Sequence, residues 1–213
     1  MTHLFLIRHG QYLEDDAHPI LNPELSPEGI IQAERLRDRL SVSGEIKADV
    51  LISSPLARAQ QTANIIAPAL GLPVTLDPDM EEWRTEHEGV NQDDFVVGLR
   101  AAPLDQRPFY EPYPGGETGS QFFFRVGTAL NRITQQYAGK VIVIMGHGGI
   151  IQASFQFFGG HSPLRMPTMS LDAGYTCITH WEKIPGNPVD RWLLERHNDI
   201  AHRHDWLSQL PTP

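Results

Sequence analysis

Residues 141–149 read VIVIMGHGG, an unbroken apolar run that leads into a histidine flanked by glycines. Such a run is typical of a strand that is buried on both faces of a sheet. Two earlier segments have the same form: His3–Ile7 leads into Arg8-His9-Gly10, and Asp49–Ser53 leads into a second serine. Three buried strands, each followed by polar or glycine-rich residues, indicate a sheet covered on both sides.

Helical patterns separate these strands. Ser26-Pro27-Glu28 is an N-cap with proline at the first helical position, and apolar residues follow at helical spacing. Ser54-Pro55 repeats the cap signal before a second apolar stripe. The two expected stripes are Ile30, Ala33, Leu36 and Leu40, then Leu56, Ala59, Ala63, Ile66 and Leu70. Further elements expected are strands at 73–76, 175–181 and 191–196 and helices at 122–137 and 150–158.

Alternating strands and helices predict an α/β fold, a three-layer α/β/α sandwich with a mixed, mainly parallel sheet. Residues 77–117 lack a comparable pattern and are rich in proline, glycine and acidic residues. We expect a single domain over 1–213, with a lid or insertion at about 77–117 that contains a short helix near 93–100. The tail from Ala201 is expected to be short and irregular.

Charge narrows the classes of partner. The 213 residues carry 17 basic and 26 acidic side chains, a net charge of −9, which argues against nucleic acid and against anionic membrane surfaces. Residues 77–94 hold eight acids and one base, so they contribute −7 and leave −2 for the remainder. The acidity therefore belongs to the expected lid, and an anionic substrate stays compatible with the rest of the chain.

The compartment is predicted from what the chain lacks. Cys177 is the only cysteine, so no internal disulfide can form, and a reducing compartment follows. The apolar run near the start, Leu4–Ile7, is too short for a signal peptide, and no later run approaches the length of a membrane span. We expect a cytoplasmic protein.

Reactive side chains follow the strands. Arg8 and His9 come after the first strand, Arg58 lies in the first turn after the second, and His147 follows the strand at 141–145. Ligands of open α/β sheets bind beyond the carboxyl ends of the strands, so parallel strands would bring these four residues together. Two helix N-termini would add N–H groups that attract anions. Guanidinium groups match phosphate oxygens, and the set predicts a site for a compact dianion such as phosphate.

Five segments together resemble the histidine phosphatase superfamily, whose founding members are the cofactor-dependent phosphoglycerate mutases. They are LIRHGQ at 6–11, LSPEGIIQAERL at 25–36, SSPLARAQQTA at 53–63, MGHGGIIQA at 145–153 and NDIAH at 198–202. The resemblance runs along nearly the whole chain in the family's order, and it implies a phosphoglycerate mutase-like fold.

The resemblance also implies roles. His9 would be the nucleophile that forms a phosphohistidine intermediate, while Arg8, Arg58 and His147 would hold the phosphoryl oxygens. Neither a metal nor a cofactor is then needed. Gln11, Tyr12 and Gly148 would contact the substrate.

A proton donor for the leaving group completes the implied site. The family often places a glutamate after the third strand, and Met80-Glu81-Glu82 fits that pattern. Glu82 is our choice for this acid and Glu81 the alternative. Crowding by neighbouring acids would favour a proton-carrying carboxyl. For most other acids of this run, we expect no more than a solvated face.

Departures from the family pattern bear on the reaction. Tyr12 and Asp15 stand where relatives that act on small metabolites often have Thr or Ser and Asn. The Gln11-Tyr12 pair resembles a phosphatase subgroup that includes a protein phosphatase. Arg84 is the only basic residue between 59 and 99, so the arginine pair with which mutases bind a carboxylate is missing.

These departures favour hydrolysis of phosphomonoesters by a metal-independent phosphatase, with a phosphorylated small molecule or a phosphoprotein as substrate. A mutase, a catalytically silent phospho-ligand-binding relative and a metal-dependent hydrolase are the alternatives, and homodimer formation stays open.

The remaining candidates receive structural interpretations or weaker assignments. Residues 114–117 are expected to turn into the long helix, and the resemblance places Glu117 near the mouth of the site. Phe122–Phe124 are expected to pack in the core. His202 and His204 are two residues apart, but no carboxylate–histidine spacing completes a zinc pattern, so a structural role is expected.

Overall fold

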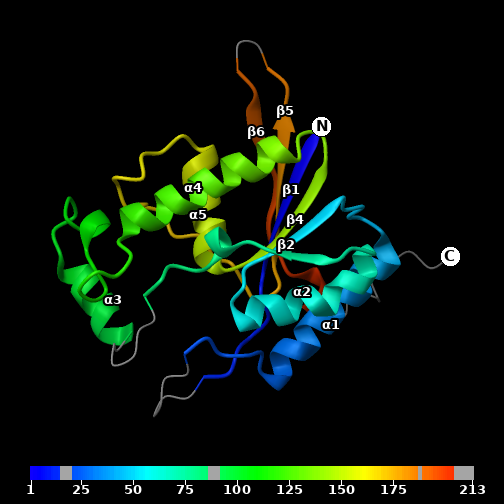
Figure 1. The fold of residues 1–213 in the computed structure, drawn as a ribbon, viewed down its shortest axis with the longest axis horizontal. Helices are drawn as coiled ribbons and strands as arrows, with labels where there is room; N and C mark the ends of the chain where they lie inside the picture. The colour runs from blue at the N-terminus through cyan, green and yellow to red at the C-terminus, as the bar shows by residue number, and fades with distance from the viewer. Residues whose placement is uncertain (15–20, 86–91, 187–188, 204–213) are drawn as a thin grey trace.

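The computed structural model describes residues 1–14, 21–85, 92–186 and 189–203, and for residues 92–94 it describes the backbone only. Within these ranges six strands form one sheet in the order β3-β2-β4-β1-β5-β6 (Figure 1). The strands are β1 Thr2–Arg8, β2 Val50–Ser53, β3 Val74–Leu76, β4 Val141–Gly146, β5 Ile178–Ile184 and β6 Arg191–Asp199. The first four strands pair in parallel, and β5 and β6 are antiparallel, which confirms the mixed, mainly parallel sheet.

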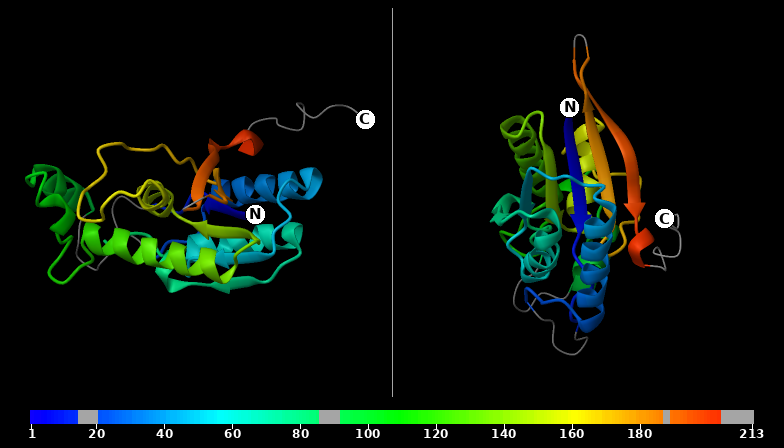
Figure 2. Two further views of the ribbon diagram at one scale, coloured as in Figure 1. Left: turned by 90° about the horizontal axis from the view of Figure 1, so that it is seen from above. Right: turned by 90° about the vertical axis from the view of Figure 1, so that its right-hand side faces the viewer.

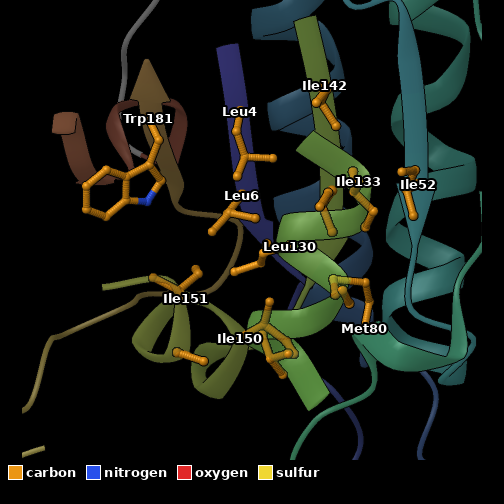
Figure 3. Packing of buried hydrophobic residues seen from close by; sticks show 14 of the residues in the cluster. Leu4, Leu6, Ile52, Met80, Leu130, Ile133, Ile142, Ile150, Ile151 and Trp181 are labelled. Atoms are coloured by element: carbon orange, nitrogen blue, oxygen red, sulfur yellow. The ribbon is translucent and has the colours of Figure 1, made fainter. Parts of the chain in front are cut away.

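Helices pack on both faces of the sheet, and the predicted three layers are confirmed (Figure 2). Alternate residues of a strand point to opposite faces, and β1 follows this rule. Leu4 and Leu6 join the core under α4 (Gly119–Gln136) and α5 (Gly148–Phe158), whereas Phe5 and Ile7 join the core under α1 (Pro27–Ser43) and α2 (Ala57–Leu70). Figure 3 shows the first of these cores, with side chains of β1 and β4 close to those of α4 and α5. The helix α3 spans Gln92–Ala101.

Local signals explain where two of the helices begin. The Ser26 side chain accepts a hydrogen bond from the Gly29 N–H with Pro27 in the first turn, so the predicted cap of α1 is confirmed. At the start of α4, Thr118 and Gln121 form a capping box in which each side chain bonds the other residue's N–H. Residues 114–117 lead into this cap, and Gly115 takes the left-handed conformation that favours glycine.

Three details of the sequence prediction are wrong. The α2 helix begins at Ala57 with Leu56 at the N-cap position, because the Ser54 hydroxyl bonds His147 and the Leu56 N–H instead of capping the helix. Ile30 is exposed, and the polar Gln32 is buried on the inner face of α1 because its amide oxygen accepts the Gln11 N–H. The expected strand at 175–181 is shifted, since β5 starts only at Ile178.

The predicted core packing of Phe122–Phe124 is confirmed for two of the three residues. Phe122 and Phe123 are buried in the core as predicted, whereas Phe124 is two-thirds exposed. The α4 helix presents only part of its surface to the sheet, and three consecutive helical residues cannot all face it. Phe124 therefore points away from the core.

The segment between β3 and α4 leaves the sheet. Its described part contains the short 3₁₀ turns η1 Pro78–Met80 and η2 Arg107–Phe109 and the helix α3, which confirms the expected short helix near 93–100. Figures 1 and 2 show α3 beyond the N-terminal end of α4. The tail from Ala201 begins with a third 3₁₀ turn, η3 Ala201–Arg203. Among the described residues, no helix has the length and apolar character that crossing a membrane requires.

A close backbone contact joins the loop after β1 to the first turn of α1. A side chain on Gly29 would overlap the carbonyl oxygen of Gln11, and one on Gly10 would overlap the carbonyl oxygen of Gly29. Both obstructing atoms belong to the backbone and cannot rotate away. The loop that carries His9 is therefore packed against α1 through two glycines.

We expect Gly29→Ala to destabilise the protein by about 1–3 kcal/mol, the usual cost of overpacking. In an uncrowded helix the same change would stabilise by about 0.5–1 kcal/mol. Denaturant unfolding measures the difference, with the exposed neighbour Ile30→Ala as control, for which a change within about 0.5 kcal/mol is expected. A Gly29→Ala protein as stable as the wild type would contradict the contact.

Candidate active site

The carboxyl ends of β1, β2 and β4 bring the predicted residues together. Arg8 is the last residue of β1 and pairs in register with Gly146 of β4, so His9 and His147 follow neighbouring strands. Arg58 lies in the first turn of α2, just after β2. His9, Arg58 and His147 are all buried, and the two imidazole rings lie 5.0 Å apart between centroids. The convergence that the sequence predicted from parallel strands is present.

His9 is held as a neutral imidazole with one nitrogen engaged. Its Nδ1 lies 2.6 Å from the carbonyl oxygen of Gly10, so Nδ1 carries the proton and Nε2 keeps its lone pair. Burial, reinforced by the positive charges of Arg58 and Arg8, lowers the pKa of His9 from 6.5 to about 3 against the opposing effect of the Gly10 hydrogen bond. At neutral pH the Nε2 atom is therefore a nucleophile that needs no separate base.

His147 is the second neutral imidazole. Its Nε2 lies 2.8 Å from the Ser54 hydroxyl, and both residues are fully buried. Burial lowers the pKa of His147 well below its usual value, and the nearby His9, Arg58 and Arg8 act in the same direction. Its Nδ1 is buried and has no hydrogen-bond partner among the residues that the structure describes.

Two tyrosines orient the arginines. The Arg8 guanidinium carbon lies 4.2 Å from the ring centroid of Tyr175, and that of Arg58 lies 5.3 Å from the ring centroid of Tyr12. Both tyrosine rings have centroids 5.8 Å from that of His9. Burial raises the pKa of the half-buried Tyr12 hydroxyl, which keeps it neutral. Tyr12 belongs to the predicted set, whereas sequence reasoning missed Tyr175.

The C-terminal NDIAH segment supports the loop that carries Tyr175. The Asn198 side chain accepts a hydrogen bond from the Gly174 N–H at 2.8 Å, and His202 Nε2 lies 2.9 Å from the Thr176 hydroxyl. These contacts flank Tyr175 on both sides. The structural role expected for His202 is confirmed, while His204 lies outside the described residues.

Gln11 and Gly148 occupy different surroundings. The Gln11 side-chain oxygen accepts a hydrogen bond from the Ser26 hydroxyl at 3.3 Å, so this side chain turns toward the first turn of α1. Gly148 opens α5 and lies against Arg8, since a Cβ atom there would be 3.8 Å from Arg8 Nε. Asp15, the residue that departs from the family pattern, lies outside the described ranges.

Glu82 reaches the site from the segment after η1. Its carboxylate accepts hydrogen bonds from the N–H groups of Gly149 and Trp83, both at 2.9 Å. A side chain at Gly149 would overlap this carboxylate, so the Glu82 side chain would have to move to admit one. Of the N–H groups expected to attract an anion at the start of α5, that of Gly149 therefore donates to the Glu82 carboxylate.

The alternative acid, Glu81, is engaged elsewhere. Its carboxylate accepts a hydrogen bond from Arg84 Nε at 2.8 Å, and the same guanidinium donates to the carbonyl of Pro78. Of the two glutamates, Glu82 is the one whose carboxylate reaches the start of α5, within two residues of His147.

Arg125 of α4 fixes the backbone around Glu82. Its guanidinium donates to the carbonyl oxygens of Asp79, Glu81 and Glu82 at 2.8, 3.0 and 3.2 Å. It also forms a bidentate pair with Glu117, with both N–O distances 2.7 Å. The resemblance placed Glu117 near the site mouth, and in the structure its carboxylate binds Arg125, which also contacts the Glu82 backbone. Sequence reasoning did not single out Arg125.

The acidic run is more ordered than expected. Asp77 is buried and, with Asp79, binds Arg132 of α4 at 2.9 and 3.2 Å, so the solvated-face prediction is wrong for Asp77. Glu86 and Glu88 lie outside the described residues, as do the side chains of Asp93 and Asp94. Nowhere in the described ranges do three or more His, Cys, Asp or Glu side chains gather as a metal site.

The assembled groups suit a phosphoryl group. Two guanidiniums supply fixed positive charge, and two neutral imidazoles supply a lone pair at His9 and a ring nitrogen at His147. A carboxylate stands beside them on the first turn of α5. Arginine recognises phosphate oxygens through paired N–H donors.

Comparison with known proteins identifies relatives along the whole chain. An uncharacterized phosphatase, PhoE, from Bacillus subtilis (strain 168) is 26% identical over 214 residues, covering 98% of this chain and 100% of the relative. Phosphoglycerate mutase-like protein 4 of Arabidopsis thaliana is 34% identical, covering 93% of this chain and 86% of the relative. Among solved structures, a mutant phosphoserine phosphatase from Entamoeba histolytica in complex with phosphoserine is similar with a TM-score of 0.72. It is 26% identical, and the match covers 95% of this chain and 99% of that one.

These likenesses confirm the phosphoglycerate mutase-like fold and the resemblance to the family. The family model described as histidine phosphatase superfamily (branch 1) matches residues 4–199. The chain therefore belongs to the histidine phosphatase superfamily.

Proposed function

We propose that this protein hydrolyses phosphomonoesters through a phosphohistidine intermediate on His9, without a metal ion. The observation that carries the proposal is the state of His9: a neutral ring whose Nδ1 is engaged by Gly10, so that Nε2 keeps a free lone pair. Arg8, Arg58 and His147 surround it and supply the charge stabilisation that phosphoryl transfer requires.

In the first step, the Nε2 lone pair of His9 attacks phosphorus while the bond from phosphorus to the ester oxygen breaks. Arg8 and Arg58 offset the charge on the phosphoryl oxygens, and His147 contributes an N–H donor. The general acid is assigned to Glu82, which gives a proton to the departing alkoxide. This arrangement is supported by the Glu82–Gly149 hydrogen bond, which keeps the carboxyl group beside His147.

In the second step, water attacks the phosphorus of phosphohistidine and the nitrogen–phosphorus bond breaks. The electron pair returns to Nε2, Glu82 takes a proton from the water, and inorganic phosphate leaves. The enzyme is then restored in atoms, charge and protonation. The substrate proposed is a phosphorylated small molecule or a phosphoprotein, and the phosphoserine bound by the similar solved structure is of this class.

Hydrolysis is favoured over mutase action by the engagement of Arg84. A mutase returns the phosphoryl group to the substrate and must hold a substrate carboxylate meanwhile. Arg84 is the only lysine or arginine between 59 and 99, and its guanidinium bonds Glu81 and Pro78. The mutase remains the second candidate because several relatives carry a phosphoglycerate mutase name, among them phosphoglycerate mutase-like protein 4 and probable phosphoglycerate mutase GpmB.

We expect His9→Ala to abolish both activity and covalent labelling. With a panel of aryl phosphates, phosphorylated metabolites and phosphopeptides, the wild type should release inorganic phosphate and, when quenched rapidly, carry acid-labile phosphate. The substitution should lower kcat at least about 10³-fold, whereas the exposed His161→Ala should match the wild type. Undiminished activity in His9→Ala would refute the intermediate, and isomerised ester without phosphate release would favour the mutase.

We expect Glu82→Gln to impair substrates according to their leaving group. An alkyl phosphate needs a proton on the departing oxygen and should lose about 10²–10⁴-fold in kcat/KM, while an aryl phosphate should lose less than about tenfold. Glu81→Gln is the matched control and should change both substrates little. Equal losses on the two substrates with Glu82→Gln would assign the proton to another group.

We expect Arg125→Lys, like Glu82→Gln, to impair alkyl phosphates more than aryl phosphates, but by a smaller factor. Lysine cannot bind three carbonyls and a carboxylate at once, so the Glu82 backbone should shift and alkyl phosphates should lose about tenfold more than aryl phosphates. Steady-state kinetics on both substrates measures the effect. Arg132→Lys, which alters another arginine of α4, should leave the ratio of alkyl to aryl phosphate activity unchanged. If Arg125→Lys lowered the activity on alkyl and aryl phosphates equally, the role of Arg125 would be purely structural.

A further inference from the structure

We infer that Ser54 is a positioning residue that fixes the tautomer of His147, so that His147 presents Nδ1–H as a donor to an oxygen of the transferring phosphoryl group. This inference rests on the proposed function and assigns a residue that the expected catalytic set does not contain. It concerns which of the two ring nitrogens carries the single proton of a neutral imidazole.

The contact joins two strand ends that are distant in sequence. Ser54 follows β2, and its backbone N–H donates to the Met145 carbonyl of β4 at 2.9 Å. His147 follows β4, and its Nε2 lies 2.8 Å from the Ser54 hydroxyl oxygen. Both side chains are fully buried, so water cannot replace either partner.

A count of protons decides the direction of this hydrogen bond. The hydroxyl of Ser54 has one proton and two lone pairs. Within the described chain its oxygen has two partners, the Leu56 N–H at 3.2 Å and His147 Nε2. The Leu56 N–H uses one lone pair. The hydroxyl proton then has a single acceptor within reach, which is His147 Nε2.

The opposite direction would leave buried groups without partners. If Nε2 carried the proton, Ser54 would accept twice and its own proton would point at no acceptor among the described residues. A buried polar group without a partner loses the hydrogen bond that water would give it and is destabilising. Donation from Ser54 avoids this cost and requires that the proton of the neutral ring sit on Nδ1.

The other ring nitrogen of His147, Nδ1, is the one available to a phosphoryl oxygen. Nδ1 of His147 is buried and has no partner among the described residues, and its ring lies beside that of His9. As Nδ1–H it is a donor for a phosphoryl oxygen on His9. As a bare lone pair it would repel that oxygen, so the tautomer decides whether His147 stabilises the transferring group or opposes it.

The tautomer can be measured directly in the ligand-free wild type. Long-range ¹H–¹⁵N correlation spectra distinguish a protonated from an unprotonated ring nitrogen, and His147→Gln assigns the signals by their loss. We expect Nδ1 of His147 to be protonated and Nε2 to be bare. A proton on Nε2, or on both nitrogens at neutral pH, would overturn the inference. This readout requires no activity, so it fails or succeeds independently of the proposed function.

Substitution then tests the role of the hydroxyl. Ser54→Ala removes the donor to Nε2, and we expect both tautomers of His147 to appear in the spectrum. With inorganic phosphate as probe, the shift of the Nδ1 signal should weaken, and kcat should fall about tenfold or more on alkyl and aryl phosphates alike. The equal loss distinguishes this effect from one on Glu82.

The neighbouring serine supplies the control. Ser53 is also fully buried, but its hydroxyl donates to the carbonyl of Ser54 at 2.8 Å and does not reach the imidazole. Ser53→Ala should therefore leave Nδ1 of His147 as the protonated nitrogen. Its kcat should stay within about twofold of that of the wild type. An unchanged tautomer in Ser54→Ala, or the same mixture in Ser53→Ala, would overturn the inference, and the wild-type spectrum decides it even if Ser54→Ala does not fold.

Discussion

The parallel pairing of β4 between β1 and β2 is the constraint on which the rest of the site depends. Its register sets Arg8 opposite Gly146 and Ser53 opposite Met145, so the residues that follow three strands emerge at one edge of the sheet. Helices cover both faces of these strands, and the apolar runs hold that register because a slip by one residue would move their side chains to the wrong core. His9, His147, Arg8 and Arg58 are placed by this single geometric relation.

Burial then sets the chemistry at that edge. Withdrawal from water keeps His9 and His147 neutral, and stacking on Tyr175 and Tyr12 orients the Arg8 and Arg58 guanidiniums. Glu82 is positioned by a different part of the structure. Arg125 of α4 binds the backbone around Glu82 and directs its carboxylate to the start of α5. The sheet thus positions the two histidines and two arginines, and α4 positions Glu82.

Local sequence signals failed to predict the structure where a residue distant in the sequence competed for the same side chain or the same buried position. Ser26-Pro27 and Ser54-Pro55 carry the same cap pattern, yet only Ser26 caps its helix. The hydroxyl of Ser54 bonds an imidazole that lies 93 residues away. Ile30 fits the helical spacing but faces outward, because the buried face of α1 must also satisfy the Gln11 N–H through a polar side chain. Local rules could not reveal either competitor.

The sequence by itself determined the buried strands, the layered α/β fold and the four residues that follow parallel strands, because apolar runs and their polar ends are local features. Only the tertiary structure decided the roles of Tyr175, Ser54 and Arg125. Tyr175 precedes a strand, and it meets His9 because β5 runs antiparallel to β1, a direction that no local pattern encodes. Arg125 and Glu117 are eight residues apart on the chain, and their shared contact with the Glu82 segment exists only once α4 packs beside it. Contacts between distant segments depend on packing, and packing is a property of the folded chain as a whole.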